Sequence, residues 1–381
     1  MHKPSYRILC VAAAMALVLP GDSILYAVLP SYYPRLGLSP IEVGILLSAN
    51  RWVRLVSNLV AERCFRQSGA EYWLVVALLI GSLVMVIYGT FTTFWVLLAA
   101  RIVWGISFSF IRQAGIMTVV GASRRGYLAT NMGYFNSLTA AGGIAGVLLG
   151  GLGHDTIGLT WTLLAFFAVS LAAIPLGYIS QRGFTLPRPA ATGPATGEAN
   201  WRFMCYGFAV GMVGPGLIYS TLGLVLKERL GDQVKLFGLV LGIATLSGIV
   251  LSFQRILDGF CSPVLGAIGD RFVRERLVPV AFLIGAMGLG LAGYSSGAVG
   301  ILVGVLVLFV SSTLLIILLN AWAGQKGART ASVFFTASDF GSGIGPLIGW
   351  GITQLTLAPV WILLSGTVVY GMGFLLSRKQ D

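Results

Sequence analysis

Apolar stretches of about 20 residues recur along almost the whole chain, and few folds accommodate them. A helix needs about 20 apolar residues to cross the hydrocarbon core of a bilayer. Hydrophobic residues make up 56% of the sequence and charged residues only 10%, whereas a soluble protein carries about 25% charged residues. We therefore predict an all-α polytopic membrane protein whose main partner is the lipid bilayer.

Residues 181–200 are the only long polar interruption, and they divide twelve predicted spans into two groups of six. The Pro, Gly, Ala and Thr content of this segment is typical of a flexible linker. We expect two pseudo-symmetric six-helix bundles, over residues 1–180 and 201–381, joined by a cytoplasmic linker at 181–200. The predicted spans are 8–32, 40–61, 73–90, 94–120, 127–151, 159–180, 202–226, 237–261, 277–295, 299–322, 330–354 and 358–377.

The basic residues orient these spans. With the N-terminus inside, sixteen of the 25 Lys and Arg residues fall in cytoplasmic segments, four in outer segments and five within spans. Basic residues favour the cytoplasmic side of a membrane. We predict that both termini are cytoplasmic and that the membrane is a bacterial cytoplasmic (inner) membrane. The first apolar run contains Asp22 and no small-residue cleavage pattern, so we expect a span there and not a removable signal.

Several functional classes are disfavoured. The net charge of +12 does not indicate nucleic-acid binding, because the basic residues lie between apolar runs and form no single stripe. Two histidines and four cysteines without metal-ligand spacing give no reason to expect a metal or cofactor. The pair His154–Asp155, in an outer loop, is the only suggestion of catalysis, so we do not expect an enzyme. We see no channel filter, and no large extra domain of the kind a non-transporting receptor would carry.

The two groups of spans repeat each other. The loop after the second span, "NLVAERCFRQ", aligns with "GAIGDRFVRER" after the eighth. "GIAGVLLGG" in the fifth span aligns with "GIGPLIGWG" in the eleventh. Two bundles built on one pattern are a common transporter architecture. The aligned pairs are Glu62 with Asp270, Arg63 with Arg271, Arg66 with Arg274, Gly146 with Gly345 and Gly150 with Gly349.

On these motifs the sequence resembles the major facilitator superfamily over essentially the whole chain. The loop from Gly266 to Arg274 is similar to that family's cytoplasmic signature between the second and third helices of each half. The first copy departs from it, with Asn58 for the usual Gly and Glu62 for the usual Asp. "LLAARIVWG", which contains Arg101, resembles the family's fourth-helix motif.

Two further stretches resemble the same family. "GVLLGG", from Gly146, is similar to the fifth-helix motif of its antiporters, with Val147 where Pro is usual. The copy in the second half keeps Pro346. "GDSILYAVLP", with Asp22 and Pro30, resembles the first helix. The resemblance implies a twelve-helix transporter, similar to proton-coupled drug and metabolite efflux antiporters, in which the glycine packing seals the exchange path between states.

The paired acidic loops favour a gate. A carboxylate near the N-terminus of a neighbouring helix gains about 0.3–2 kcal/mol, which is small enough to be made and broken in each cycle. We expect Glu62 and Arg63 in the first half, and Asp270, Arg271 and Arg274 in the second, to latch the cytoplasmic side of the outward-open state. The alternative is that they are ordinary loop charges.

Eight ionisable residues lie within predicted spans, and each central charge costs about 2.5–3.5 kcal/mol in lipid. They must face water or pair internally. Arg255 and Asp258 are three residues apart and can pair; the Pro20–Gly21 dipeptide predicts a local break beside Asp22. The eight residues are Asp22, Arg51, Arg54, Arg101, Arg112, Arg255, Asp258 and Asp339.

These charges lead to two hypotheses. In the first, Arg51, Arg54 and Arg112 attract an anionic or zwitterionic substrate into a central cavity, because the arginine fork binds carboxylate or phosphate through two hydrogen bonds. The alternative is that the arginines pair with aspartates and hold the bundles in register. In the second, Asp22, Asp339 or both carry the coupling proton, and the resemblance gives Arg101 a role in proton coupling near the first helix. Further candidate cavity residues are Tyr26, Tyr134 and Asn136.

We therefore predict a secondary active transporter that acts as a monomer by alternating access. The favoured activity is proton-coupled export of a small organic solute that is anionic or zwitterionic, such as a metabolite, siderophore or drug-like acid. The alternatives are proton-coupled import of an organic anion and, less favoured, a non-transporting receptor on a transporter fold.

Overall fold

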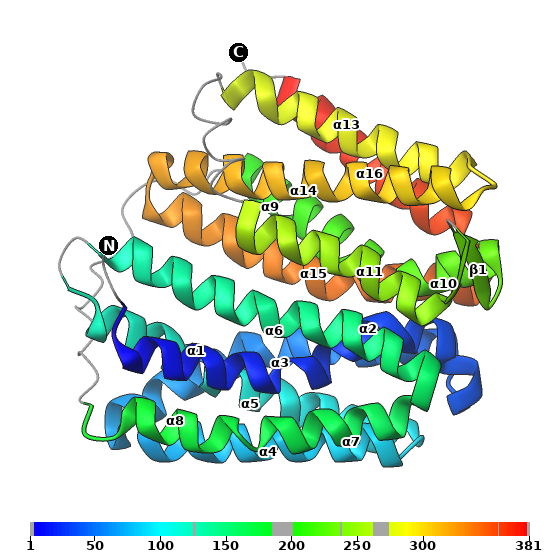
Figure 1. Cartoon of the computed structure of the whole chain (residues 1–381). Helices are drawn as coiled ribbons and strands as arrows, with labels where there is room; N and C mark the ends of the chain where they lie inside the picture. The colour runs from blue at the N-terminus through cyan, green and yellow to red at the C-terminus, as the bar shows by residue number, and fades with distance from the viewer. Residues whose placement is uncertain are drawn as a thin grey trace.

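The computed structural model describes residues 4–124, 127–184, 201–236, 238–261, 274–356 and 358–378. Long helices lie side by side along one common direction (Figure 1). The chain begins and ends at the same end of this bundle, which we call the terminal end. A two-stranded sheet lies at the opposite end, which we call the hairpin end (Figure 1).

The first half, residues 4–184, forms six crossings of the bundle. The first crossing divides at the predicted break, since α1 ends at Val18 and α2 begins at Pro20, although Leu19 between them keeps helical dihedral angles. The last crossing divides in the same way into α7 and α8. The helices are α1 (Tyr6–Val18), α2 (Pro20–Tyr32), α3 (Pro40–Ser68), α4 (Glu71–Thr90), α5 (Phe94–Ala122), α6 (Leu128–Ile157), α7 (Leu159–Ser170) and α8 (Ala173–Gln181), with a short 3-10 turn η1 (Tyr33–Leu36) after α2.

The second half, residues 201–378, has corresponding crossings with two π-helical segments. Pro215 lies inside the first of them, where a proline cannot donate the usual helical hydrogen bond and so disturbs the ladder. The elements are α9 (Trp201–Gly211), η2 (Met212–Ile218), α10 (Tyr219–Leu230), β1 (Gln233–Leu236), β2 (Leu239–Gly242), α11 (Ile243–Ile256), η3 (Leu257–Cys261), α13 (Arg274–Tyr294), α14 (Ala298–Lys326), α15 (Ala328–Thr356) and α16 (Val360–Arg378).

Two sequence-based boundaries were wrong. The span expected at 237–261 begins as a helix only at Ile243, because residues 239–242 pair with 233–236 in an antiparallel hairpin. The fold is all-α, and this hairpin is the only β-structure within the described ranges. The loop expected after residue 61 is helical, since α3 continues to Ser68; Glu62 and Arg63 therefore lie in the last turns of a helix. Residues 262–273, which include Asp270 and Arg271, lie outside the described residues.

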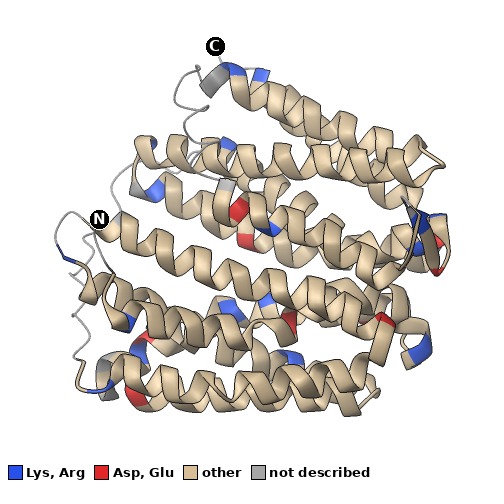
Figure 2. Cartoon of the chain, in the orientation of Figure 1, with Lys and Arg blue, Asp and Glu red and all other residues tan. Residues whose placement is uncertain are grey.

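Ten segments of the described chain are long and apolar enough to cross a membrane. They correspond to ten of the twelve predicted spans. The two others, α3 and α15, are equally long at 29 residues each but carry more polar side chains. These two helices contact each other. Figure 2 shows the charged residues gathered mainly at helix ends, with a smaller group at mid-length of the central helices.

The two halves meet mainly where α3 packs on α15, α6 packs on α11, and α2 packs on both α10 and α11. Within the first half α6 packs on α2, and within the second half α15 packs on η2. We propose, from this packing, that the halves are the two bundles expected from sequence. The predicted linker falls mostly on residues 185–200, which lie outside the described residues.

The repeated glycines lie at equivalent contacts. A Cβ added to Gly146 would lie 2.6 Å from Cα of Pro20, and one added to Gly150 would lie 2.6 Å from Ile24. In the second half a Cβ at Gly345 would lie 2.6 Å from Cα of Gly216. Small residues let helix backbones approach this closely. Both copies of the glycine pattern therefore pack a helix onto the first crossing of its own half.

The contact also involves the neighbouring turn in the second half. A Cβ at Gly349 would lie 2.8 Å from both Leu217 and Thr221. The backbone oxygen of Pro346 is turned the other way, toward Gly44 of α3, at 3.2 Å from the position of an added Cβ. The second copy of the motif thus takes part both in packing within its half and in the contact between halves.

Candidate functional site

A cavity of about 270 Å³ lies between the two halves at mid-length. We call it the central cavity. Three arginines and three aspartates line it, together with aromatic and amide side chains. The lining residues are Leu19, Asp22, Tyr26, Asn50, Arg51, Arg54, Trp104 and Phe108 from the first half, and Pro215, Tyr219, Gln254, Arg255, Asp258, Ser338, Asp339 and Ser342 from the second.

Asp22 is held by a buried arginine. Arg101, on α5, has no exposed surface and forms an ion pair with Asp22, whose side chain is 13% exposed. The Nε of Arg101 also donates to the backbone oxygen of Leu46 at 2.8 Å, and the amide of Asn50 donates to Asp22 at 3.3 Å. The charge of Arg101 is therefore compensated, and Asp22 connects α2, α3 and α5 at the edge of the central cavity.

Arg51 connects the two halves. Its guanidinium donates to the backbone oxygen of Ser342 on α15 and, at 2.7 Å, to that of Pro215 in the π-helix η2. The carbonyl partners lie 291 and 164 residues away in the chain. The sequence-based alternative, in which the arginines hold the bundles in register, is therefore seen for Arg51, but the partners are carbonyl oxygens and not aspartates.

Arg54, one turn further along α3, has a different environment. Its guanidinium carbon lies 5.2 Å from the centre of the Phe108 ring, which is a cation–π distance. Its Nε atom is buried and has no hydrogen-bond partner among the described residues. The side-chain oxygens of Asn50 and Gln254 are also buried and unpartnered at the same cavity. Orphaned polar atoms of this kind indicate a place for a polar ligand or water.

Tyr26 lies at the centre of the site. The guanidinium carbons of Arg51 and Arg101 each lie 5.8 Å from its ring centre. Its ring centre is 5.2 Å from that of Tyr219, across the interface between halves. Tyr26 therefore contacts both arginines of the first half and Tyr219 of the second half.

The second half contributes separate polar groups. Arg255 donates to the hydroxyl of Tyr219 at 2.9 Å, and Asp258 accepts from Thr313 at 2.6 Å. Asp339 is exposed at the cavity and its carboxylate makes no hydrogen bond or ion pair with the described residues. The cavity thus presents Arg54 from one wall and Asp339 from the other.

Several predicted site residues are elsewhere. Arg112, Tyr134 and Asn136 are exposed and do not belong to the lining of the central cavity. Glu62 is half-buried and Arg63 exposed at the terminal end of α3. Asp270 and Arg271 fall outside the described residues, and of Arg274 only the backbone at the start of α13 is described. The latch therefore stays a prediction, because its second copy lies mostly outside the described residues.

The hairpin end of the interface is closed. Asp155, at the end of α6, accepts hydrogen bonds from the backbone N–H of Thr245 at 2.8 Å and from its hydroxyl at 2.6 Å, in the first turn of α11. Lys227 of α10 donates to the backbone oxygen of Ser31 at 2.8 Å. The sequence around Asp155 does not indicate this contact between halves, because its partner Thr245 lies 90 residues away.

Apolar groups complete this closure. Trp350 is fully buried, with its ring centre 5.1 Å from that of Tyr33. The backbone of Gly151 lies directly against that of Ala244, and Gly248 lies against Val147. A side chain at either glycine would collide with the opposite backbone, so the hairpin end is sealed by close helix contact.

The sequence matches the Major Facilitator Superfamily over residues 11–346. It is 22% identical to Multidrug resistance protein 2 of Bacillus subtilis (strain 168), over 94% of this chain and 92% of that protein. It is 26% identical to Multidrug resistance protein MdtG of Yersinia enterocolitica, over 90% of this chain and 83% of that protein. The fold is similar to that of a bacterial homologue of the human lysosomal transporter Spinster, solved inward-facing and unoccupied, with a TM-score of 0.77 and 14% identity over 99% of this chain and 98% of that one.

This match agrees with the structure. Ten segments of the described chain are long and apolar enough to span a membrane, and a charged cavity lies between the two halves. The chain belongs to the major facilitator superfamily, and it is an integral membrane transporter, not an enzyme.

Proposed function

We propose that this transporter exports a small organic solute that carries an acidic group, anionic or zwitterionic, by alternating access coupled to protons. The observation that carries the proposal is the Nε of Arg54, which is buried at the central cavity with no partner in the part of the chain that the structure describes. A buried donor left unpaired costs about 1–3 kcal/mol, and more when it is charged. A bound carboxylate or phosphate would remove that cost. The names of the two multidrug resistance relatives support the outward direction.

The opposite wall favours a zwitterion over a simple anion. Asp339 is exposed at the cavity without an ion pair, and Asp258 lies on the same wall. An ammonium group of a solute whose acid binds Arg54 would find a carboxylate there. The volume of about 270 Å³ lies just below the range of about 300–1,000 Å³ for pockets that take drug-sized ligands. The site therefore favours a small metabolite or drug-like acid over a siderophore.

We propose that the terminal end is cytoplasmic and that the described conformation opens toward it. The bias of Lys and Arg placement supports this orientation. Arg112 and Asn136 are exposed on the portions of α5 and α6 nearest the terminal end, and polar side chains within spans require water. The hairpin end, in contrast, is sealed by Asp155 and the glycine contacts.

In the opposite conformation we expect the terminal end to close. Glu62 and Arg63 at the end of α3, together with Asp270, Arg271 and Arg274, are our candidates for this latch, on the strength of the repeated sequence. The glycines of α6 and α15 would keep each half compact while the halves rock against each other, as expected for antiporters. The protein would cycle as a monomer, since each chain contains both halves.

Proton coupling is assigned to Asp22, with Asp339 as the second candidate. Protonation of Asp22 would break its ion pair with Arg101 and release the contact among α2, α3 and α5, so a proton is linked to helix movement. In proteoliposomes with an imposed pH gradient, we expect Asp22→Asn to bind solute but to lose its response to the gradient. Asp339→Asn is the parallel variant. Transport by Asp22→Asn that still follows the gradient would remove Asp22 from this role.

The substrate proposal is tested first by binding. A thermal-shift screen of purified protein against organic anions, zwitterions and cations would find ligands, and proteoliposome uptake in both directions would follow. A charged hydrogen bond is worth about 1.5–3 kcal/mol, so Arg54→Ala should weaken binding of an acidic ligand about 10- to 100-fold. Arg276→Ala is the matched control, because it removes an exposed arginine on α13, outside the cavity.

The outcomes separate the alternatives. If only cations stabilise the protein, or if Arg54→Ala leaves the affinity for acids unchanged, the assignment of Arg54 fails. If an acidic ligand binds but moves inward with protons, the protein is an importer of organic anions. Binding without transport in either direction would favour the non-transporting receptor.

A further inference from the structure

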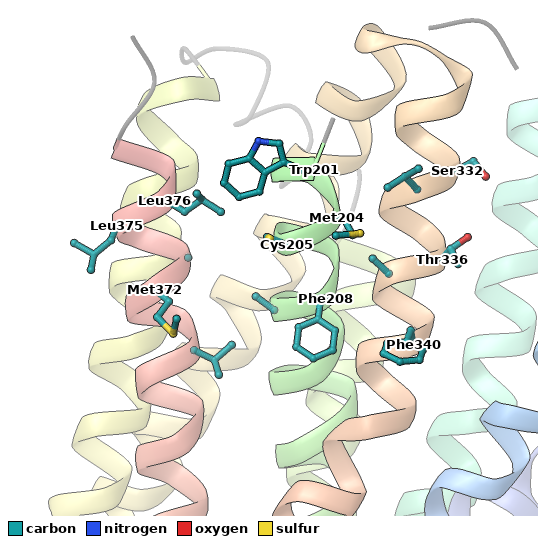
Figure 3. Close-up of a pocket in the computed structure, with 15 residues that line it drawn as sticks. Trp201, Met204, Cys205, Phe208, Ser332, Thr336, Phe340, Met372, Leu375 and Leu376 are labelled. Carbon is teal, nitrogen blue, oxygen red and sulfur yellow. The ribbon is translucent and has the colours of Figure 1, made fainter. Parts of the chain in front are cut away.

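A second hollow lies outside the central cavity, on the second half. It is an open groove of about 1020 Å³ that crosses α9 between α15 and α16 (Figure 3). Trp201 lies at the beginning of α9, near the terminal end, and Phe208 lies two turns further along (Figure 3). We call this hollow the outer groove. It shares no lining residue with the central cavity.

The walls of the outer groove are apolar and exposed. Met204, Met372 and Leu375 are 49%, 64% and 60% exposed, and Trp201 is 58% exposed. An exposed apolar patch of this size on a soluble protein marks a contact site. On membrane-spanning helices the surrounding medium is hydrocarbon, so the group that fills an apolar groove at this depth is a lipid tail.

The charges around the mouth of the groove identify the lipid. The three helices that form it each carry an arginine at the terminal end: Arg202 on α9, Arg329 on α15 and Arg378 on α16. No acidic residue occurs in the first two turns of α9 and α15 or in the last two turns of α16. Arg329 and Arg378 are exposed. Basic clusters at helix ends attract anionic headgroups, and tryptophan favours the same depth of the membrane.

We infer that the outer groove binds one anionic phospholipid from the leaflet at the terminal end. One acyl chain lies along α9 from Trp201 toward Phe208, and the headgroup phosphate lies near Arg329 and Arg378. The inference is independent of the solute that the central cavity takes. It predicts that the purified transporter retains an anionic lipid in preference to a zwitterionic one of the same chain length.

Native mass spectrometry of the detergent-solubilised protein, titrated with phosphatidylglycerol or phosphatidylcholine of matched chains, tests this. Two variants separate the tail from the headgroup. Cys205→Trp places bulk on the floor of the groove, since Cys205 lines it and is partly exposed. Arg329→Gln with Arg378→Gln removes two charges at the mouth. Val368→Trp, on α16 at a 61% exposed position outside the groove, controls for added bulk.

The wild-type protein and Val368→Trp should carry one phosphatidylglycerol at least 10-fold more often than one phosphatidylcholine. Cys205→Trp should carry either lipid about 10-fold less often than the wild-type protein. The double arginine variant should bind the two lipids equally. Equal binding of both lipids to the wild-type protein overturns the inference, as does retention of the adduct by Cys205→Trp. A mass that shows a second copy of the chain in place of lipid also overturns it.

Discussion

The interface between the two halves is built differently on the two sides of the central cavity. Toward the hairpin end, backbones touch at Gly151, and the carboxylate of Asp155 is bound by Thr245. Toward the terminal end, Asp258 and Asp339 are exposed, and a Cβ added to Gly133 of the same helix α6 would meet nothing within 4 Å. One helix therefore takes part in a sealed contact at one end and leaves open space at the other.

This difference shows how the charges are distributed between structural and binding roles. Arg51 is occupied by two carbonyls of the second half, whereas Arg54, one turn nearer the terminal end, has an unpartnered Nε. Contacts on the sealed side define the conformation, and polar groups on the open side remain available to a ligand. In the alternating-access cycle that we propose, the sealed side must open at a modest cost in free energy.

The largest expected effect is a loss of stability and transport when the ion pair of Asp22 and Arg101 is broken. This pair lies at the central cavity, between the sealed and the open side of the interface. Removal of one partner of a buried pair leaves an uncompensated charge and costs about 3–5 kcal/mol. Arg101→Ala should lower the free energy of unfolding by that amount and abolish transport. Chemical unfolding in detergent micelles measures it, with exposed Arg112→Ala as control. A loss below 1 kcal/mol would show that the pair does not support the site.

A pair of glycine substitutions on α6 tests the comparison directly. Gly151→Ala places a methyl group against the backbone of Ala244, and overpacking of this kind costs about 1–3 kcal/mol. Gly133→Ala meets open space and should stabilise the helix by about 0.5–1 kcal/mol. We expect only Gly151→Ala to open the hairpin end.

Distances between spin labels measure this opening. Ile157→Cys on α6 and Leu239→Cys on β2 place labels at exposed positions of the two halves at the hairpin end, after the four native cysteines are replaced. Longer label distances are expected for Gly151→Ala and unchanged ones for Gly133→Ala. The same distances for both variants would mean that close packing at Gly151 does not hold the hairpin end shut.

The smallest effect is expected at Asp155. Its two hydrogen bonds to Thr245 join the halves, but the side chain is partly exposed, so their loss should cost about 1–2 kcal/mol. Asp155→Ala should increase the open fraction at the hairpin end by about 5- to 30-fold in the same label experiment. Asp155→Asn keeps one acceptor oxygen, so its open fraction should lie between those of the wild-type protein and Asp155→Ala. An open fraction equal to that of the wild-type protein would reduce Asp155 to a surface contact.

Much of the fold was predictable from local sequence. The length of the apolar stretches predicted where the chain crosses the bundle. The helix boundary at Pro20 was predicted from the chemistry of proline and is confirmed. The hairpin was missed, because residues 233–242 are nearly as apolar as the span that follows, and only strand pairing distinguishes them. The extension of α3 through Glu62 is not evident from the sequence, because charged residues also occur in the loops that end such spans.

The candidate site was predictable in kind and less so in detail. A charge in a span cannot face lipid without a large cost, so Asp22, Arg51, Arg54 and Asp339 were candidates before any fold was known, and all four line the central cavity. The same reasoning selected Arg112, which is exposed and is not among the residues that line the cavity. Helical spacing places a side chain on a face but does not say which neighbour covers that face.

Local chemistry thus established the membrane class, the family resemblance and the set of charges that need a partner or water, because each depends on residues close together in the chain. The choice of partners required the packed halves. Arg51 donates to carbonyls 291 and 164 residues away, whereas Arg54 donates to none in the described residues, and Asp155 accepts from the start of a helix 90 residues further on. Such contacts depend on where distant backbones approach, and that follows from the packing of whole helices.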